Sequence, residues 1–174
     1  MYKVERKPVV IIESGMAIAL ALVLSRITIF RLSNGGEISL EMLPLLILSV
    51  RRGILTGILT GATFGGVFKL INGGIVLHPV QYLLDYPLAF AMLGFSGIAF
   101  QNPRICFVIT AMILSVMLRL SCHWSSGVFF FSNYAPPGQM IWLYSLLYNL
   151  SYIIPSAVIC ITIAPAIILR LRKE

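Results

Sequence analysis

The sequence predicts an all-α integral membrane protein, a bundle of six helical segments with both termini in the cytoplasm. Of its 174 residues, 59% are hydrophobic and only 11% are charged, whereas a soluble domain carries about 25% charged residues. Long apolar segments alternate with short turns of Gly, Asn and Pro. The net charge of +7 comes from Lys and Arg at the segment ends, a pattern typical of membrane topology signals and not of a nucleic-acid-binding surface.

We expect a single transmembrane domain, residues 1–174, in a multi-pass protein of the cell membrane. After a basic head, 1–7, the expected segments are 8–30, 41–50, 54–71, 79–100, 105–122 and 140–169. The first begins at Pro8, which suits the first turn of a helix. Its small residues stand one turn apart in two pairs, Gly15 with Ala19 and Ala17 with Ala21. Such pairs let another helix approach closely, either within the fold or in a partner subunit.

The remaining segments carry distinct signals. Segment 41–50 is shorter than the roughly 20 residues that a membrane span needs, and we leave open whether it crosses. Segment 54–71 repeats glycine at 57, 61 and 65, which predicts a smooth face for close packing. Segments 79–100 and 105–122 are separated by the turn 101–103. The last, 140–169, contains two prolines that are expected to bend it.

The distribution of basic residues predicts the orientation. Nine of the 13 Lys and Arg residues lie in the head, at 51–52, at 104 and in the tail, and the other four are Arg26, Arg31, Lys69 and Arg119. The positive-inside rule therefore places both termini in the cytoplasm. The loops 31–40 and 72–78 then face outward together with the stretch 123–149.

The stretch 123–149 is rich in rings and has no Lys, Arg, Asp or Glu. Glycine and proline at 127 and 136–138 are expected to interrupt any long helix there. Two interpretations are open: an aromatic belt at the membrane interface, or a ring-lined site for a flat, cationic small molecule.

Asp85 is the main candidate for a binding residue, because it is the acid that lies well inside a long apolar segment. A carboxylate at that depth costs at least about 2.5–3.5 kcal/mol unless it finds a partner or lines a wet cavity. The alternative is a structural ion pair with Arg119. Gln81 shares a helix face with Asp85, and Tyr86 follows it.

Two further polar residues, His123 and Asn149, are expected near the same outer leaflet. Each alone is more typical of an interface residue or a helix–helix hydrogen bond. The sequence holds no phosphate-binding loop and no spacing of metal ligands, and its three cysteines are far apart. We therefore expect no cofactor or metal, and any active transport requires partner subunits.

Four blocks of the sequence resemble the thiamine-specific substrate-binding (S) component of energy-coupling factor (ECF) vitamin transporters. They are GGEISLEMLPLLILSVRRG, HPVQYLLDYPLAF, HWSSGVFFFSNYAPPG and YSLLYNLSYIIPS, in this order between residue 13 and about 160. The resemblance implies a six-helix S-component fold in a prokaryotic plasma membrane and an outward vitamin pocket. It also implies a complex with a transmembrane coupling subunit and two ATPases that delivers the vitamin inward.

Carried over by position, the resemblance implies a set of contacts. Those with the vitamin are Asp85, Tyr86, His123, Gly127, Phe131, Tyr144 and Asn149, and those with the coupling subunit are Gly15 and Ala19. The chain departs from some members, which have Glu at the position of Asp85, Trp at that of Phe131, and Trp in the first outer loop, where this chain has Asn34-Gly35-Gly36. Phe is a weaker partner for a cation than Trp.

Three alternatives remain at this point. The first is an S component for another flat vitamin or for a thiamine precursor such as its pyrimidine moiety. The second is a small membrane enzyme with Asp85 and His123 as acid and base, although the sequence shows no nucleophile for it. The third is a structural scaffold in which Asp85 pairs with Arg119 and no cavity exists.

Overall fold

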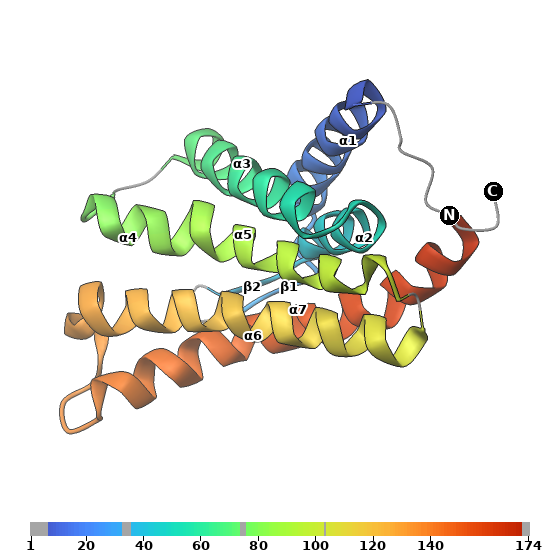
Figure 1. Ribbon diagram of the computed structural model, residues 1–174. Coiled ribbons are helices and arrows are strands. Elements are labelled where there is room, and N and C mark those ends of the chain that lie inside the picture. The colour runs from blue at the N-terminus through green and yellow to red at the C-terminus, as the bar shows by residue number, and fades with distance from the viewer. Residues whose placement is uncertain (1–6, 33–35, 74–75, 103, 172–174) are drawn as a thin grey trace.

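The computed structural model describes residues 7–32, 36–73, 76–102 and 104–171, and within them it is a helical bundle (Figure 1). Five helices are long and apolar enough to cross a membrane. They are α1 (Lys7–Arg26), α3 (Ile54–Asn72), the continuous helical run Pro79–Phe100, α6 (Ile105–Phe130) and α7 (Ile141–Leu171). The all-α membrane class is thereby confirmed. Most of the expected basic head and tail, and Asn34, Gly35 and Pro103 of the expected turns, lie outside the described ranges.

The open question about segment 41–50 is answered by a short helix, α2 (Met42–Arg52). Its 11 residues extend only about 16 Å, roughly half of the hydrocarbon thickness. Most of α2 is buried, including Leu45, Leu46 and Val50. The chain reaches α2 through a small antiparallel pair, β1 (Phe30–Arg31) and β2 (Glu37–Ile38). Loop 31–40 is therefore partly built into the bundle, not only exposed at the outer face.

The glycines of α3 pack directly on the backbone of the helical run Pro79–Phe100, as their spacing predicts. A Cβ at Gly61 would collide with the carbonyl of Phe90, and one at Gly65 with the carbonyl of Tyr86. A Cβ at Gly57 would lie 2.7 Å from Cα of Gly94. Because these contacts are between backbones, they fix the position of the run Pro79–Phe100 along α3.

The run Pro79–Phe100 is not a uniform α-helix. It passes from α4 (Pro79–Leu83) through a π-helical turn, η1 (Leu84–Leu88), to α5 (Ala89–Met92) and a 3-10 segment, η2 (Leu93–Phe100). Pro87 lies inside η1, and its missing N–H and its ring prevent regular α-helical bonding there. A π turn of this kind often occurs at a functional position, and η1 contains Asp85 and Tyr86.

The aromatic stretch divides into two parts, which corrects the expected boundaries. α6 does not end near residue 122 but continues through Gly127 to Phe130, so Gly127 does not interrupt the helix. A short 3-10 turn, η3 (Ser132–Tyr134), and the Pro136–Gly138 region then connect α6 to α7. Gly127 allows α7 to pack closely against α6, because a Cβ at this position would collide with Ser145 of α7.

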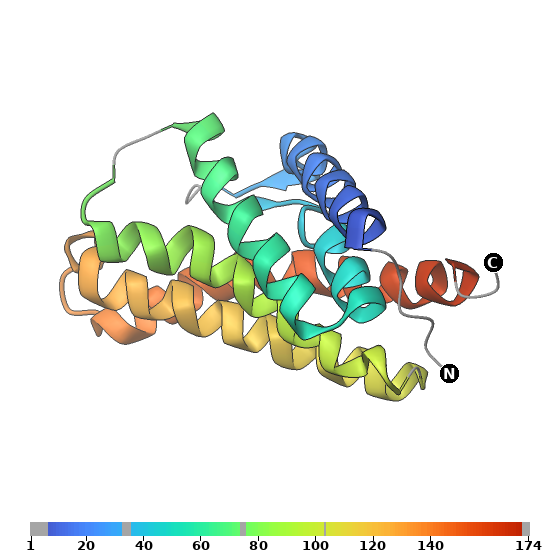
Figure 2. The same ribbon diagram turned by 45° about the horizontal axis from the view of Figure 1, so that its top comes forward.

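The predicted sidedness agrees with the arrangement of the helix ends. The start of α1, the junction of α2 with α3, the start of α6 and the end of α7 lie toward one end of the bundle (Figures 1 and 2). These ends carry Lys7, Arg51, Arg52, Arg104 and Arg170. The connections from α3 to α4 and from α6 to α7 lie at the opposite end (Figure 2).

Candidate functional site

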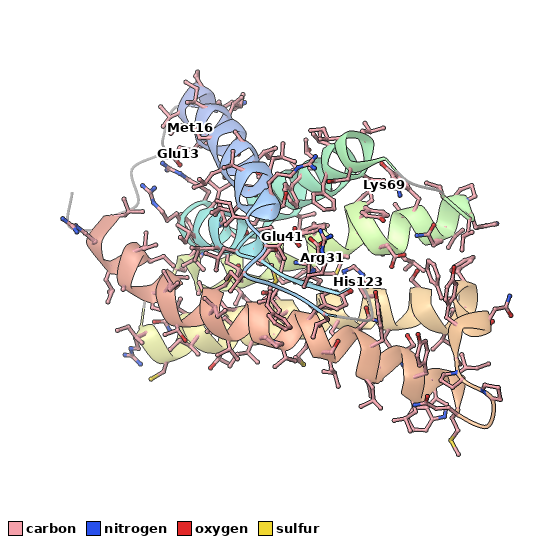
Figure 3. All side chains as sticks on the ribbon, turned by 180° about the vertical axis from the view of Figure 1, so that it is seen from behind. Glu13, Met16, Arg31, Glu41, Lys69 and His123 are labelled. Atoms are coloured by element: carbon pink, nitrogen blue, oxygen red, sulfur yellow. The ribbon has the colours of Figure 1, made fainter. Side chains whose placement is uncertain are left out.

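A cavity of about 510 Å³ lies between η1, α6, α7 and the segment that carries β2. It brings together residues that are far apart in the sequence. Seven of the predicted binding residues line it: Asp85, Tyr86, His123, Gly127, Phe131, Tyr144 and Asn149. Glu41 and His123 lie near one another in the middle of the bundle, whereas Glu13 lies away from them on α1 (Figure 3).

Asp85 enters the cavity from the π turn, with its side chain 15% exposed. One carboxylate oxygen, Oδ2, accepts hydrogen bonds from Gln81 Nε2 at 2.7 Å and from Ser126 Oγ at 2.8 Å. The other, Oδ1, lies 3.4 Å from Nδ1 of His123. In the part of the chain that the structure describes, no Lys or Arg forms an ion pair with Asp85. The expected alternative, a pair with Arg119, is therefore wrong.

Arg119 instead pairs with Glu41, which the sequence analysis did not select. Its Nη2 lies 2.9 Å from Oε1 of Glu41, and its guanidinium stands 4.0 Å from the centre of the Phe90 ring. Arg119 Nε also donates to Nε2 of His123 at 3.4 Å. Because a guanidinium stays protonated, Nε2 of a neutral His123 is the acceptor and Nδ1 carries the proton that faces Asp85.

Glu41 was missed because it stands at the start of a short segment, where an acid is ordinary. The signal that could have found it is the buried guanidinium of Arg119, which needs a carboxylate partner. Glu13 is a second acid inside an apolar helix, and its Oε1 accepts from Arg52 Nη2 at 2.6 Å. Asp85 is thus not alone as an intramembrane acid; it differs in having neutral donors as partners.

Rings form the walls of the cavity. Tyr144 and Tyr148 of α7 stack at 6.3 Å between ring centres, and Tyr152 meets Tyr148 edge-on at 5.7 Å. Phe131 stands at the end of α6 with Tyr134 6.0 Å away. The aromatic stretch therefore contributes to a cavity wall. Other rings, such as Trp124, Phe129 and Trp142, remain exposed, which is typical of an interface belt, so both interpretations hold for different residues.

Asn149 and Gly127 hold α6 and α7 together beside the cavity. Asn149 Nδ2 donates to the carbonyls of Ser145 at 2.8 Å and His123 at 3.5 Å, while its Oδ1 accepts from Tyr152 Oη at 2.7 Å. A Cβ at Gly127 would collide with Ser145 Oγ. Asn149 thus faces the cavity with most of its hydrogen-bonding capacity already used by the protein.

Three predicted residues lie elsewhere. Gln81 is buried behind Asp85 and does not line the cavity. Gly15 and Ala19 lie on the exposed side of α1, and a Cβ at Gly15 would meet no atom within 4 Å. Ala17 and Ala21 are the buried pair, and α1 packs against α2 and α3. The two small-residue pairs therefore separate, one facing inward and one outward.

Comparisons with known proteins agree with this geometry. The thiamine transporter ThiT of Bacillus subtilis (strain 168) is 37% identical over 163 residues, covering 86% of this chain and 85% of that protein. ThiT of Lacticaseibacillus paracasei is 29% identical over 155 residues, covering 81% and 77%. The solved structure of ThiT from Listeria monocytogenes matches with a TM-score of 0.86 at 26% identity, covering 97% of this chain and 98% of that one.

The resemblance to thiamine-specific S components is confirmed by these relatives and by one further match. The family described as thiamine transporter protein (Thia_YuaJ) matches residues 11–173, which include every helix that surrounds the cavity. The chain therefore belongs to the thiamine transporter protein family.

Proposed function

We propose that this chain is the thiamine-binding S component of an ECF-type ABC importer. Transport, not catalysis, is the activity of its family. The observation that carries the proposal is the carboxylate of Asp85, which faces a ring-walled cavity with neutral hydrogen-bond donors as its partners. Such a carboxylate is suited to a cationic guest, and thiamine carries a positive thiazolium ring. The whole chain, 1–174, acts as one substrate-binding domain in the cell membrane.

The charges around the cavity support a cation as the guest. Three carboxylates, of Glu37, Glu41 and Asp85, and one guanidinium, of Arg119, are among the lining residues. Glu41 is paired with Arg119, and Glu37 with Arg31 at 2.5 Å. With His123 neutral, the charge of Asp85 is left for the guest. A monocation balances that charge, whereas an anionic guest adds a second one.

The two rings of thiamine are assigned to different walls. We place the thiazolium between Asp85 and the face of Phe131, because ring faces attract cations by about 0.5–2 kcal/mol. Tyr86 contributes a second ring wall. For the aminopyrimidine edge, Tyr144 supplies a hydroxyl, Asn149 supplies the remaining acceptor capacity of its Oδ1, and His123, whose ring nitrogens already face Arg119 and Asp85, supplies a ring contact. Gly127 lines the cavity where α6 packs against Ser145 of α7, and Gln81 acts through Asp85.

Inward delivery requires partners, since the sequence contains no nucleotide-binding loop. We propose a transmembrane coupling subunit and two ATPases. The outward pair on α1, Gly15 and Ala19, is proposed as the face that meets the coupling subunit, because small residues permit close helix approach. The exposed residues beside this pair are apolar, including Ile12, Met16 and Leu20, as a helix interface within the membrane requires.

Two measurements test the proposed function. Mass spectrometry of the detergent-solubilised protein should find thiamine bound after purification, and calorimetry of ligand-free protein should give saturable thiamine binding. Competition with the free pyrimidine moiety distinguishes the alternative, an S component for a precursor. If the pyrimidine competes as well as thiamine, the thiazolium contributes nothing to binding, and the assignment of Asp85 to the thiazolium is wrong.

A further inference from the structure

The carboxylate of Asp85, which lines the cavity, accepts a hydrogen bond from Ser126, which does not line it. Ser126, on α6, is 0% exposed and donates its Oγ hydrogen to Oδ2 of Asp85 at 2.8 Å. The two residues are 41 positions apart in the sequence. This bond therefore joins the π turn η1 to α6 directly behind the cavity wall. It differs from the bond of Ser115, the other buried serine on α6, which donates to a carbonyl of its own helix.

The carboxylate is fixed asymmetrically. Oδ2 receives Ser126 Oγ at 2.8 Å and Gln81 Nε2 at 2.7 Å, while Oδ1 has only Nδ1 of His123 at 3.4 Å. Neither Ser126 nor Gln81 lines the cavity. Two short bonds thus occupy the oxygen nearest the protein interior and leave the other with unused acceptor capacity.

The orientation of Gln81 fits an ionised carboxylate. Its Nε2 donates to Asp85, while its buried Oε1 has no partner among the described residues. A protonated Asp85 would favour the opposite orientation of the amide, because Oε1 would then accept the acid proton. The arrangement suits an anion that receives two donors, and such charge-assisted bonds are the stronger kind.

We propose that Ser126 is a positioning residue that, with Gln81, locks Oδ2 of Asp85 and so presents Oδ1 to the cationic part of the guest. Aspartate is one methylene shorter than glutamate, so its reach into the cavity depends on where its backbone and its second oxygen are held. The π turn η1 sets the position of the Asp85 backbone, and Ser126 sets the position of its second oxygen, Oδ2. This inference rests on the proposed function and adds a specificity-determining residue to it.

The test compares two serine variants of the full-length protein in detergent. Ser126→Ala removes the bond to Asp85. The matched control is Ser115→Ala, on the same helix, because Ser115 is also 0% exposed but donates at 2.8 Å to the carbonyl of Met112 in its own helix. Titration calorimetry measures thiamine and a neutral analogue in which carbon replaces the thiazolium nitrogen.

We expect Ser126→Ala to lower thiamine affinity about tenfold, because an Asp85 side chain that is free to turn must be ordered again when the guest binds. Affinity for the neutral analogue should change less than about threefold, and Ser115→Ala should change neither by more than about twofold. In an Asp85→Asn background, Ser126→Ala should have little further effect. Equal loss for both ligands, or additive effects in the double variant, would overturn the inference.

A second variant keeps the test decisive if Ser126→Ala does not fold. Gln81→Met removes the other donor to Oδ2 at similar volume and should show the same preferential loss for thiamine. Wild-type protein that binds no thiamine refutes the proposed function itself. Wild-type binding with unchanged selectivity in the folded variants refutes only the positioning role.

Discussion

Replacing Asp85 by Asn tests whether one carboxylate carries the recognition of a cation. The substitution keeps the side-chain volume and removes the charge. It also creates a hydrogen-bonding conflict, because donors stand on both sides: Gln81 and Ser126 at Oδ2, and His123 at Oδ1. An amide nitrogen in the place of Oδ1 meets Nδ1 of His123, and one in the place of Oδ2 is accommodated only if Gln81 and Ser126 turn to accept its hydrogens. We therefore expect loss of both attraction and positioning.

The magnitude follows from the burial of the site. At about 4 Å and an effective dielectric constant of about 20, opposite unit charges attract by about 4 kcal/mol. The Asp85 side chain is 15% exposed, so water screens part of this. We expect Asp85→Asn to cost about 2–4 kcal/mol of thiamine binding, or roughly 30- to 1000-fold in Kd.

Titration calorimetry of purified protein measures this loss directly. Glu37→Gln is the matched control, because Glu37 also lines the cavity but pairs with Arg31 and has a side chain 37% exposed. It should change Kd less than about fivefold. A thermal melt confirms that each variant is folded. If Asp85→Asn bound thiamine within fivefold of the wild type, the charge argument would be refuted.

Three further predictions concern the ring wall, the α6–α7 contact and α1. Phe131→Ala should weaken thiamine binding about 3- to 30-fold and Phe131→Trp should strengthen it, since Trp is the better cation partner; the same order for a neutral analogue would contradict a cation–π role. Gly127→Ala should cost about 1–3 kcal/mol of stability by overpacking, because the new Cβ would collide with Ser145 Oγ. Gly15→Ala, which enters open space, should leave the melting temperature unchanged or raised. Gly15→Leu and Ala19→Leu should abolish uptake in cells with the energising subunits while binding persists, and normal uptake would exclude this docking face.

Much of the fold could be predicted because hydrophobic length and turn residues are local signals. The starts of α3, α6 and α7 lie within a residue or two of their expected positions. The glycine face of α3 was also predictable, since glycines repeated every four residues lie on one side of a helix and allow another helix to pack closely there. The π turn was not, because Pro87 in an apolar run permits a kink, a break or a π turn, and the packing of α3 decides among them.

The site was predicted residue by residue only where chemistry was conspicuous. A carboxylate in an apolar helix is conspicuous, so Asp85 could be selected from the sequence, and the resemblance supplied most of the other residues that line the cavity with it. Ser126 and Glu41 were missed because serine is common in membrane helices and an acid before a short helix is ordinary. Both join the candidate site through contacts with residues 41 and 78 positions away, which no local pattern reports.

The shortness of α2 has a consequence for how the assembly can form. Where the chain is extended between α1 and α2, its backbone is not shielded by helical bonds, and lipid offers no substitute partners. α1 packs against α2 and α3, so in the proposed complex its inner face stays packed in the bundle while its outer face meets the coupling subunit. A partner that displaced α1 would remove one of the helices that cover the short α2, so the proposed association leaves α1 in place and adds a layer outside it.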